Sequence, residues 1–189
     1  MKKIIGLVLI VLAFAGCKKS SSEDGEYYVK FKVNGQQVEY RKQIMNNNVL
    51  LINAGADGFY YATITGMLDT HDGVSSFLNN FIQISVKDTV AVRQGFVYNL
   101  QDGVTNNGFN HPRIILTYTD DGGTTYTASM LRSSYPNINI LNETQVVFSE
   151  INGSYAKGTF TATALKSGSL TETIAITDGE FYLKVSGPQ

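Results

Sequence analysis

The sequence is short of several residue types on which common functional sites depend. Its 189 residues include one cysteine, Cys17, two histidines, His71 and His111, and no tryptophan. A single cysteine excludes an intramolecular disulfide, and two histidines are too few for most zinc sites when no further thiolate is available. We therefore predict neither a metal nor a cofactor.

A strong charge of either sign is also missing. The 15 basic residues nearly balance the 16 acidic ones. Proteins that bind nucleic acid carry a clustered basic excess as their electrostatic footprint. The balance therefore argues against nucleic acid as a partner.

The sequence has no apolar run long enough to cross a bilayer. A spanning helix needs about 20 apolar residues, whereas the most apolar segment, 4–15, has only twelve residues and follows Lys2 and Lys3. A short apolar run behind a basic start is typical of a signal peptide. We expect residues 1–16 to be cleaved, which leaves 13 basic and 16 acidic residues.

The cysteine stands directly after this segment. The small pair Ala15-Gly16 before Cys17 resembles a bacterial lipobox, with Phe14 where that motif more often has Leu. In precursors of that family the cysteine sulfur receives diacylglycerol, the chain is cut before the cysteine, and the new amino terminus is acylated, commonly with palmitate. The resemblance implies that Cys17 is the lipid attachment site and the membrane anchor. The alternative is a free thiol behind an ordinary secretory signal.

The rest of the chain divides into a tether and one domain. After Cys17, residues 18–26 are polar throughout, so we expect 17–26 to form a flexible tether. From 27 to 189, short β-favouring runs alternate with turn clusters too frequent for an ordinary helix. We predict one all-β domain, an antiparallel, hairpin-rich β-sandwich of about 10–12 short strands. The expected strands lie near 27–33, 36–41, 49–53, 59–66, 80–87, 95–100, 113–119, 124–130, 144–151, 155–165, 171–177 and 180–185.

Three two-residue turns, at 34–35, 121–122 and 178–179, predict hairpins whose side chains sort onto consistent faces. The strand at 113–119 is apolar on both faces, which favours a central position covered by a second layer, as in a two-sheet sandwich. The expected pairs are Val29–Tyr40 and Phe31–Val38, then Thr117–Tyr126 and Ile115–Ala128, then Ile176–Phe181 and Ile174–Leu183.

Two stretches near the end of the chain carry a family resemblance. Gly158-Thr159-Phe160 in a Thr/Ala-rich strand and residues 176–181, together with the early segment "VKFKVNGQQVEY", resemble small uncharacterised all-β lipoproteins of Bacteroidota. The resemblance implies a lipid anchor on the outer membrane and brings no activity with it. Lys18 and Lys19 precede the first acidic residues of the tether, so the surface and periplasmic faces of that membrane both stay open.

Motifs for catalysis are weak. The segment 69–73 gathers Asp and His as a cation loop would, but it lacks the alternating acids of a calcium loop, so a polar turn is the simpler interpretation. No Gly-x-Ser-x-Gly motif occurs, and His111 precedes a proline in a loop rich in Gly and Asn. A glycosidase needs two facing carboxylates, and no spacing pairs any two of Glu143, Glu150, Asp178 and Glu180. We predict that the protein is not an enzyme.

The leading hypothesis is therefore a non-catalytic module that binds a glycan, a peptide or a partner protein. The loops 66–80 and 101–112 are the longest and least patterned, and they are the expected contact regions. One of Tyr60 and Tyr61, and also Tyr135, could be an exposed aromatic platform, although a packing role is the simpler interpretation for each. The alternatives are a structural component of a cell-envelope assembly without a small ligand, and, third, a hydrolase.

Overall fold

The protein folds as a single all-β domain. A computed structural model describes residues 27–41, 48–52, 55, 57–68 and 79–186. Its strands are β1 (Tyr28–Val33), β2 (Gln36–Arg41), β3 (Asn48–Ile52), β4 (Tyr60–Met67), β5 (Phe81–Asp88), β6 (Val97–Asn99), β7 (Val104–Asn106), β8 (Phe109–His111), β9 (Ile114–Thr119), β10 (Thr125–Ala128), β11 (Glu143–Ile151), β12 (Tyr155–Lys166) and β13 (Thr173–Ser186). The predicted all-β class is confirmed. The helical residues of the described part form two 3-10 turns, η2 (Leu100–Asp102) and η3 (Arg132–Ser134), and none of its helices is long and apolar enough to span a membrane.

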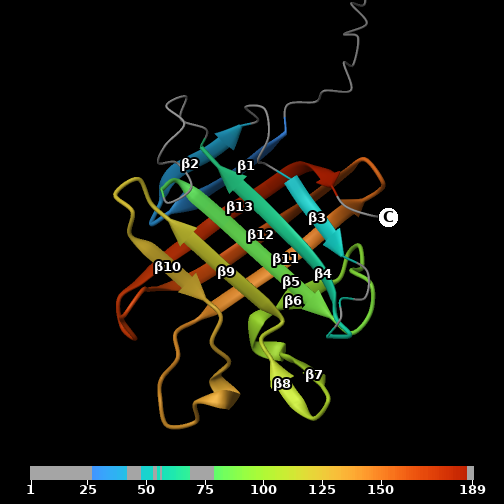
Figure 1. Cartoon of the computed structure of the whole chain (residues 1–189). Helices are drawn as coiled ribbons and strands as arrows, with labels where there is room; N and C mark the ends of the chain where they lie inside the picture. Colours follow the sequence, from blue (N-terminus) through green and yellow to red (C-terminus); the bar gives the residue numbers. More distant parts are fainter. Residues whose placement is uncertain (1–26, 42–47, 53–54, 56, 69–78, 187–189) are drawn as a thin grey trace, which may run out of the picture.

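Eleven strands form one curled sheet in the order β2-β1-β13-β3-β4-β5-β9-β10-β12-β11-β6 (Figure 1). Strand β12 also pairs with β13. The strands β13-β3-β4-β5-β9-β10-β12 therefore form a closed circuit, in which the last strand pairs with the first. The β13–β3 pair is parallel, and the other pairings are antiparallel. The hairpin β1–β2 adds to this circuit next to β13, and the strand pair β11–β6 adds to it next to β12.

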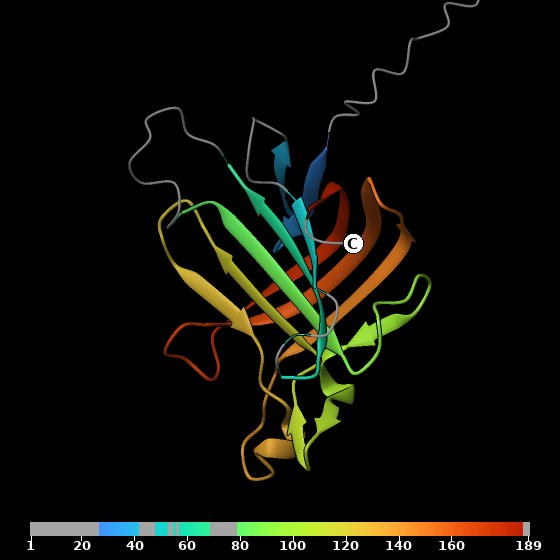
Figure 2. The same ribbon diagram turned by 45° about the vertical axis from the view of Figure 1, so that its right-hand side comes forward.

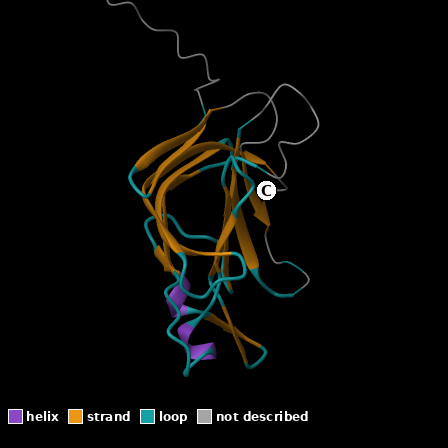
Figure 3. Cartoon of the chain, turned by 90° about the vertical axis from the view of Figure 1, so that its left-hand side faces the viewer, coloured by secondary structure: helices purple, strands orange, loops and turns teal. Residues whose placement is uncertain are grey.

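The two layers predicted for a sandwich are the opposing parts of this single sheet. Figure 2 shows strands β1 and β11–β13 curving across from strands β4, β5 and β9, and Figure 3 shows the curled sheet from another side. Alternate side chains of each strand point inward, as the burial pattern of β5 shows. The core that they form is apolar and aromatic, and its five largest fully buried members are Tyr40, Tyr98, Phe31, Phe148 and Phe181.

Two of the predicted hairpins form. The turn at 34–35 pairs Val29 with Tyr40 and Phe31 with Val38, as predicted. The hairpin β9–β10 also forms, but its register differs by one residue, since Thr117 lies opposite Thr127. The reason is a three-residue loop in place of two: Gly123 adopts φ +82°, and the carboxylate of Asp120 accepts a hydrogen bond from the Thr124 amide at 2.8 Å.

The predicted hairpin at 178–179 is wrong. Strand β13 runs without interruption from Thr173 to Ser186, and Asp178-Gly179 is a bulge inside it. Asp178 adopts φ 51°, a conformation that suits a bulge as well as a tight turn. The strand continues because β1 on one edge and β12 on the other supply hydrogen-bonding partners on both sides of the bulge.

Glycines and phenylalanines face each other across β12 and β13. Gly158 lies opposite Phe181, and Gly179 lies opposite Phe160. A Cβ atom on Gly158 would lie 2.4 Å from the Phe181 ring and 2.1 Å from the carbonyl oxygen of Val147. Each ring therefore occupies the space that a side chain on the opposite strand would need. We call strands β11, β12 and β13 the aromatic wall.

Candidate functional site

Two segments project together from one end of the sheet. They are the hairpin β7–β8 and the segment 129–142, which contains η3, and both lie at the bottom of Figures 1 and 2. Asn110 on the hairpin donates a hydrogen bond to the Ser133 hydroxyl of the other segment at 3.4 Å. The described chain starts at Tyr27, at the opposite end of the molecule. We call residues 104–111 and 129–142 the loop end.

The loop end exposes large apolar side chains. Phe109 is 71% exposed, and Tyr135, Ile138 and Leu141 are also exposed. The described chain has ten large exposed hydrophobic residues. Four of the ten lie in the loop end, although the loop end is a small part of the chain. Single exposed apolar residues are normal, whereas a gathering of them on one surface marks an interaction site.

The sequence of the β7–β8 hairpin explains why Phe109 stands out. Asn107 and Gly108 adopt φ 50° and 80°, the left-handed pair that a type I′ turn requires. Phe109 follows this turn and pairs with Asn106 on β7. We expected 101–112 to be an unpatterned loop, and that expectation is wrong. The Asn-Gly pair was a hairpin signal that the sequence analysis missed.

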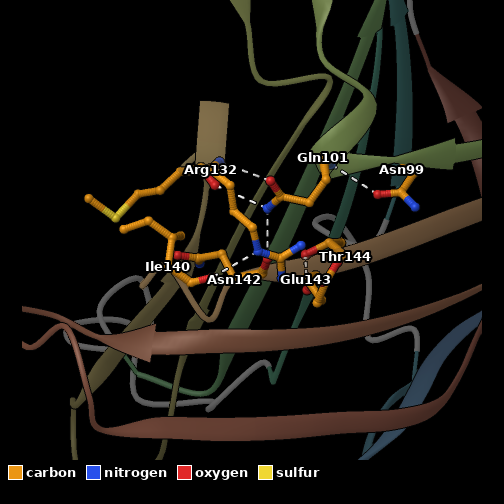
Figure 4. A network of polar contacts seen from close by, with 8 residues as sticks. Asn99, Gln101, Arg132, Ile140, Asn142, Glu143 and Thr144 are labelled. Carbon is orange, nitrogen blue, oxygen red and sulfur yellow. Dashed lines mark hydrogen bonds and ion pairs between the residues drawn. The ribbon is translucent and has the colours of Figure 1, made fainter. Parts of the chain in front are cut away.

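Gln101 fastens the segment 129–142 to the rest of the domain. Its side-chain amide donates to the carbonyl oxygens of Asn142 at 2.7 Å and Met130 at 3.2 Å, and its side-chain oxygen accepts from the Arg132 amide at 3.0 Å (Figure 4). These contacts join both stems of the segment to η2. Asn99 in turn accepts a hydrogen bond from the backbone of Gln101 at 2.9 Å.

Arg132 and Asn142 close the same segment on itself. The Arg132 guanidinium donates to the carbonyl oxygen of Ile140 at 3.0 Å and forms an ion pair with Glu143 (Figure 4). Asn142 is fully buried and donates to the carbonyl oxygen of Thr127 at 2.9 Å. The segment is therefore held by a network of polar side chains at its base, together with the burial of Leu131 and Ile140.

A buried carboxylate, that of Asp88, supports the base of the hairpin β7–β8 through Arg113. Asp88, only 4% exposed, accepts hydrogen bonds from Arg113 at 2.6 Å and Arg93 at 3.2 Å. Arg113 also donates to the carbonyl oxygen of Gly103 at 2.9 Å, immediately before β7 begins. The guanidinium of Arg93 lies 3.7 Å from the centre of the Phe96 ring. Charge and stacking together fix the base of the hairpin.

The start of β4 supports the hairpin from the side. Asn106 donates to the carbonyl oxygen of Asp57 at 2.7 Å, and the Phe59 ring meets the His111 ring edge to face at 5.3 Å. The Tyr61 hydroxyl donates to the Asp57 carboxylate, and this hydrogen bond holds the pKa of Asp57 below its ordinary value. Burial, aided by the same bond, raises the pKa of Tyr61 to about 12.

The residues singled out from the sequence are distributed over the molecule. Tyr135 is exposed at the loop end, whereas Tyr60 and Tyr61 are both half-buried. His111 packs on Phe59. The four carboxylates each have a cation of their own: Glu143 pairs with Arg132, Glu150 with Lys157, Asp178 with Lys32, and Glu180 with Lys30.

Other predicted features fall where the structure gives no description. Cys17, the segments 1–16 and 17–26, and the candidate cation loop at 69–73 lie outside the described residues, as does most of the loop 66–80. Within the described ranges, no group of three or more His, Cys, Asp and Glu side chains could hold a metal ion. Comparison of the chain with protein-family models, curated proteins and solved structures found no match.

Proposed function

We propose that the protein is a lipid-anchored, non-catalytic module of the bacterial outer membrane that binds a partner protein through its loop end. The observation that carries this proposal is the gathering of Phe109, Tyr135, Ile138 and Leu141 on two segments that are held rigidly at their bases. A surface that is already ordered loses less conformational entropy when it binds.

The chemistry of the loop end favours a protein over a glycan. Ile138 and Leu141 offer aliphatic surface, which cannot form hydrogen bonds with sugar hydroxyls. Phe109 and Tyr135 add aromatic side chains of the kind that are enriched in the buried centre of protein interfaces. The two segments also project from the domain (Figure 3), whereas a site that surrounds a small ligand is concave.

The paired carboxylates support a non-catalytic role. Glu143, Glu150, Asp178 and Glu180 are each engaged by a basic side chain within 4 Å. A general acid needs a raised pKa near the working pH, whereas hydrogen bonds, first that from Tyr155, lower the pKa of Glu150.

The lipid anchor determines how the loop end is presented. A tether over 18–26 that is fully extended reaches about 30 Å, at roughly 3.3 to 3.6 Å per residue. Because the described chain starts at the end opposite the loop end, an anchor at Cys17 leaves the loop end directed away from the membrane. In this arrangement the exposed apolar residues are available to a partner rather than to lipid.

The binding proposal is tested by co-purification of the tagged lipoprotein from its own membrane. Replacing Phe109 and Tyr135 with serine should abolish recovery of a partner protein, because their exposed surface forms the centre of the contact. Leu170, which is 46% exposed in the turn between β12 and β13, provides the control. If Leu170→Ser reduces recovery as strongly as the double variant, or neither reduces it, the loop end is not the contact surface.

The anchor is tested separately by the substitution Cys17→Ser. Loss of the sulfur should stop labelling by a palmitate analogue and release the protein from the membrane fraction. A variant that is still labelled and still sediments with membrane would contradict the anchor at Cys17.

A further inference from the structure

The outer face of the aromatic wall carries an open hollow of about 350 Å³. It lies across all three strands of the wall, and none of its lining residues belongs to the loop end. Its volume falls within the range of about 300 to 1,000 Å³ that is typical of small-ligand sites. The residues that line it are Gln145, Val147, Thr159, Phe160, Thr161, Asp178, Gly179 and Glu180.

The bulge in β13 shapes this hollow. Between Thr177 and Glu180 the strand inserts an extra residue relative to both neighbouring strands. Gly179 has no side chain, and Asp178 adopts a left-handed conformation with φ 51°. The adjoining strand β12 presents only the short side chains of Thr159 and Thr161 on this face. The bulge and the short side chains of β12 together leave the space in which the hollow lies.

The lining is rich in groups that can form hydrogen bonds. The hydroxyls of Thr159 and Thr161 and the amide of Gln145 have no hydrogen-bond partner within the described part of the protein. The carboxylates of Asp178 and Glu180 add acceptors. Donors and acceptors thus lie together on one surface, which is the combination that a polyhydroxylated ligand needs.

The charge in the hollow is already balanced. Lys30 lies 2.9 Å from the Glu180 carboxylate, and Lys32 lies 2.9 Å from the Asp178 carboxylate. A cationic ligand would have to compete with both lysines, and an anionic ligand would face both carboxylates. The arrangement therefore favours a ligand without net charge.

Apolar surface borders the polar groups. Val147 lines the hollow, and Tyr182 lies two residues beyond Glu180 on the same face of β13. Tyr182 is half-buried and packs edge to face against Tyr155 at 5.3 Å, so its ring is held in place. A pyranose ring has hydroxyls at its edge and C–H groups on its faces, and this lining offers partners for both.

We propose that the hollow is a binding site for a neutral saccharide unit. The threonine hydroxyls, the Gln145 amide and the two carboxylates contact the sugar hydroxyls, and Val147 contacts a C–H face. This site is separate from the loop end, so the protein has two binding surfaces with different chemistry.

Saturation-transfer NMR on the lipoprotein in detergent micelles tests this site, with cellobiose, maltose and N,N′-diacetylchitobiose as probes. We expect at least one of these disaccharides to receive magnetisation from the protein. Replacing Thr159 and Thr161 together with valine keeps their shape and β preference, and should weaken binding about tenfold, because two hydrogen bonds are lost. Thr163→Val is the matched control on the same face of β12, outside the hollow.

The results separate this proposal from the one for the loop end. Saccharide signals should persist in the Phe109 and Tyr135 double variant and in Thr163→Val. The proposal is overturned if none of the three probes receives magnetisation. It is equally overturned if the valine pair leaves the signals of a binding probe unchanged.

Discussion

In the aromatic wall, phenylalanine rings fill the space above glycines of the neighbouring strand, whereas at the loop end polar side chains hold backbone carbonyls. The wall is fixed by packing: Phe148 and Phe181, for example, lie 5.4 Å apart and both are buried. The loop end is held by Gln101 and Asp88 and by the buried Leu131 and Ile140. Its large exposed apolar side chains are Phe109, Tyr135, Ile138 and Leu141. The buried apolar residues of the wall are explained by folding, but these four exposed residues are not, and this difference makes them candidates for binding.

The largest expected effect is in the wall. Gly158→Ala places a methyl group against the Val147 carbonyl and the Phe181 ring, at 2.1 and 2.4 Å. Because neither the carbonyl nor the ring can move without disturbing the sheet, we expect the free energy of unfolding to fall by about 3 kcal/mol or more. Urea denaturation measures this change.

Gly108→Ala is the matched substitution at the loop end. A Cβ atom there meets nothing within 4 Å, so only the strain of φ +80° remains, which costs about 1 kcal/mol. Equal losses of stability at the two positions would contradict the steric role of Gly158.

The next effect depends on pH and concerns the core. Burial raises the pKa of Tyr118 to about 12 from its ordinary value of 10.0. The folded state therefore binds the phenolic proton more tightly than the unfolded state does. The resulting stabilisation is fully present below pH 10 and is lost as the pH rises towards 12, and it amounts to about 2 kcal/mol. Denaturation at pH 9 and 11.5 should show a smaller decrease for Tyr118→Phe than for the natural chain.

The smallest effect should stay within the loop end. Gln101→Ala removes three side-chain hydrogen bonds to the segment 129–142. We expect the amides of Ser134 and Tyr135, which bond within η3, to exchange hydrogen about tenfold faster, equivalent to about 1.4 kcal/mol of local stability. Exchange in β12 and β13 should not change. A uniform acceleration of hydrogen exchange over the whole domain would show that the Gln101 hydrogen bonds, which we call the clamp, also support the sheet.

Local patterns predicted the fold where neighbouring residues alone decide the structure. The Asn34-Gly35 hairpin had the expected register because the type I′ turn determines it. The bulge at Asp178-Gly179 was mistaken for a turn, because its local conformation suits both. Only the presence of strands on both edges of β13 decides between them, and a single sequence does not reveal those neighbours.

The candidate site was predicted less well than the fold. Tyr135 was named from the sequence and is exposed, but Phe109, the most exposed of the large hydrophobic residues in the described chain, was not. The clamp of Gln101 joins residues up to 41 positions apart, so no local pattern marks it. The hollow also escaped prediction, since it arises from the bulge that was taken for a turn.

The central claim is that a partner protein contacts the loop end. The most direct test places a photoreactive benzophenone amino acid at position 109 of the full-length protein in cells that produce it, and at position 170 in a parallel strain. Both natural side chains are exposed, by 71% and 46%, so both probes reach solvent. The account predicts a discrete crosslinked protein from position 109 and none from position 170. Absence of a crosslink at 109, or the same crosslinks at both positions, would contradict it.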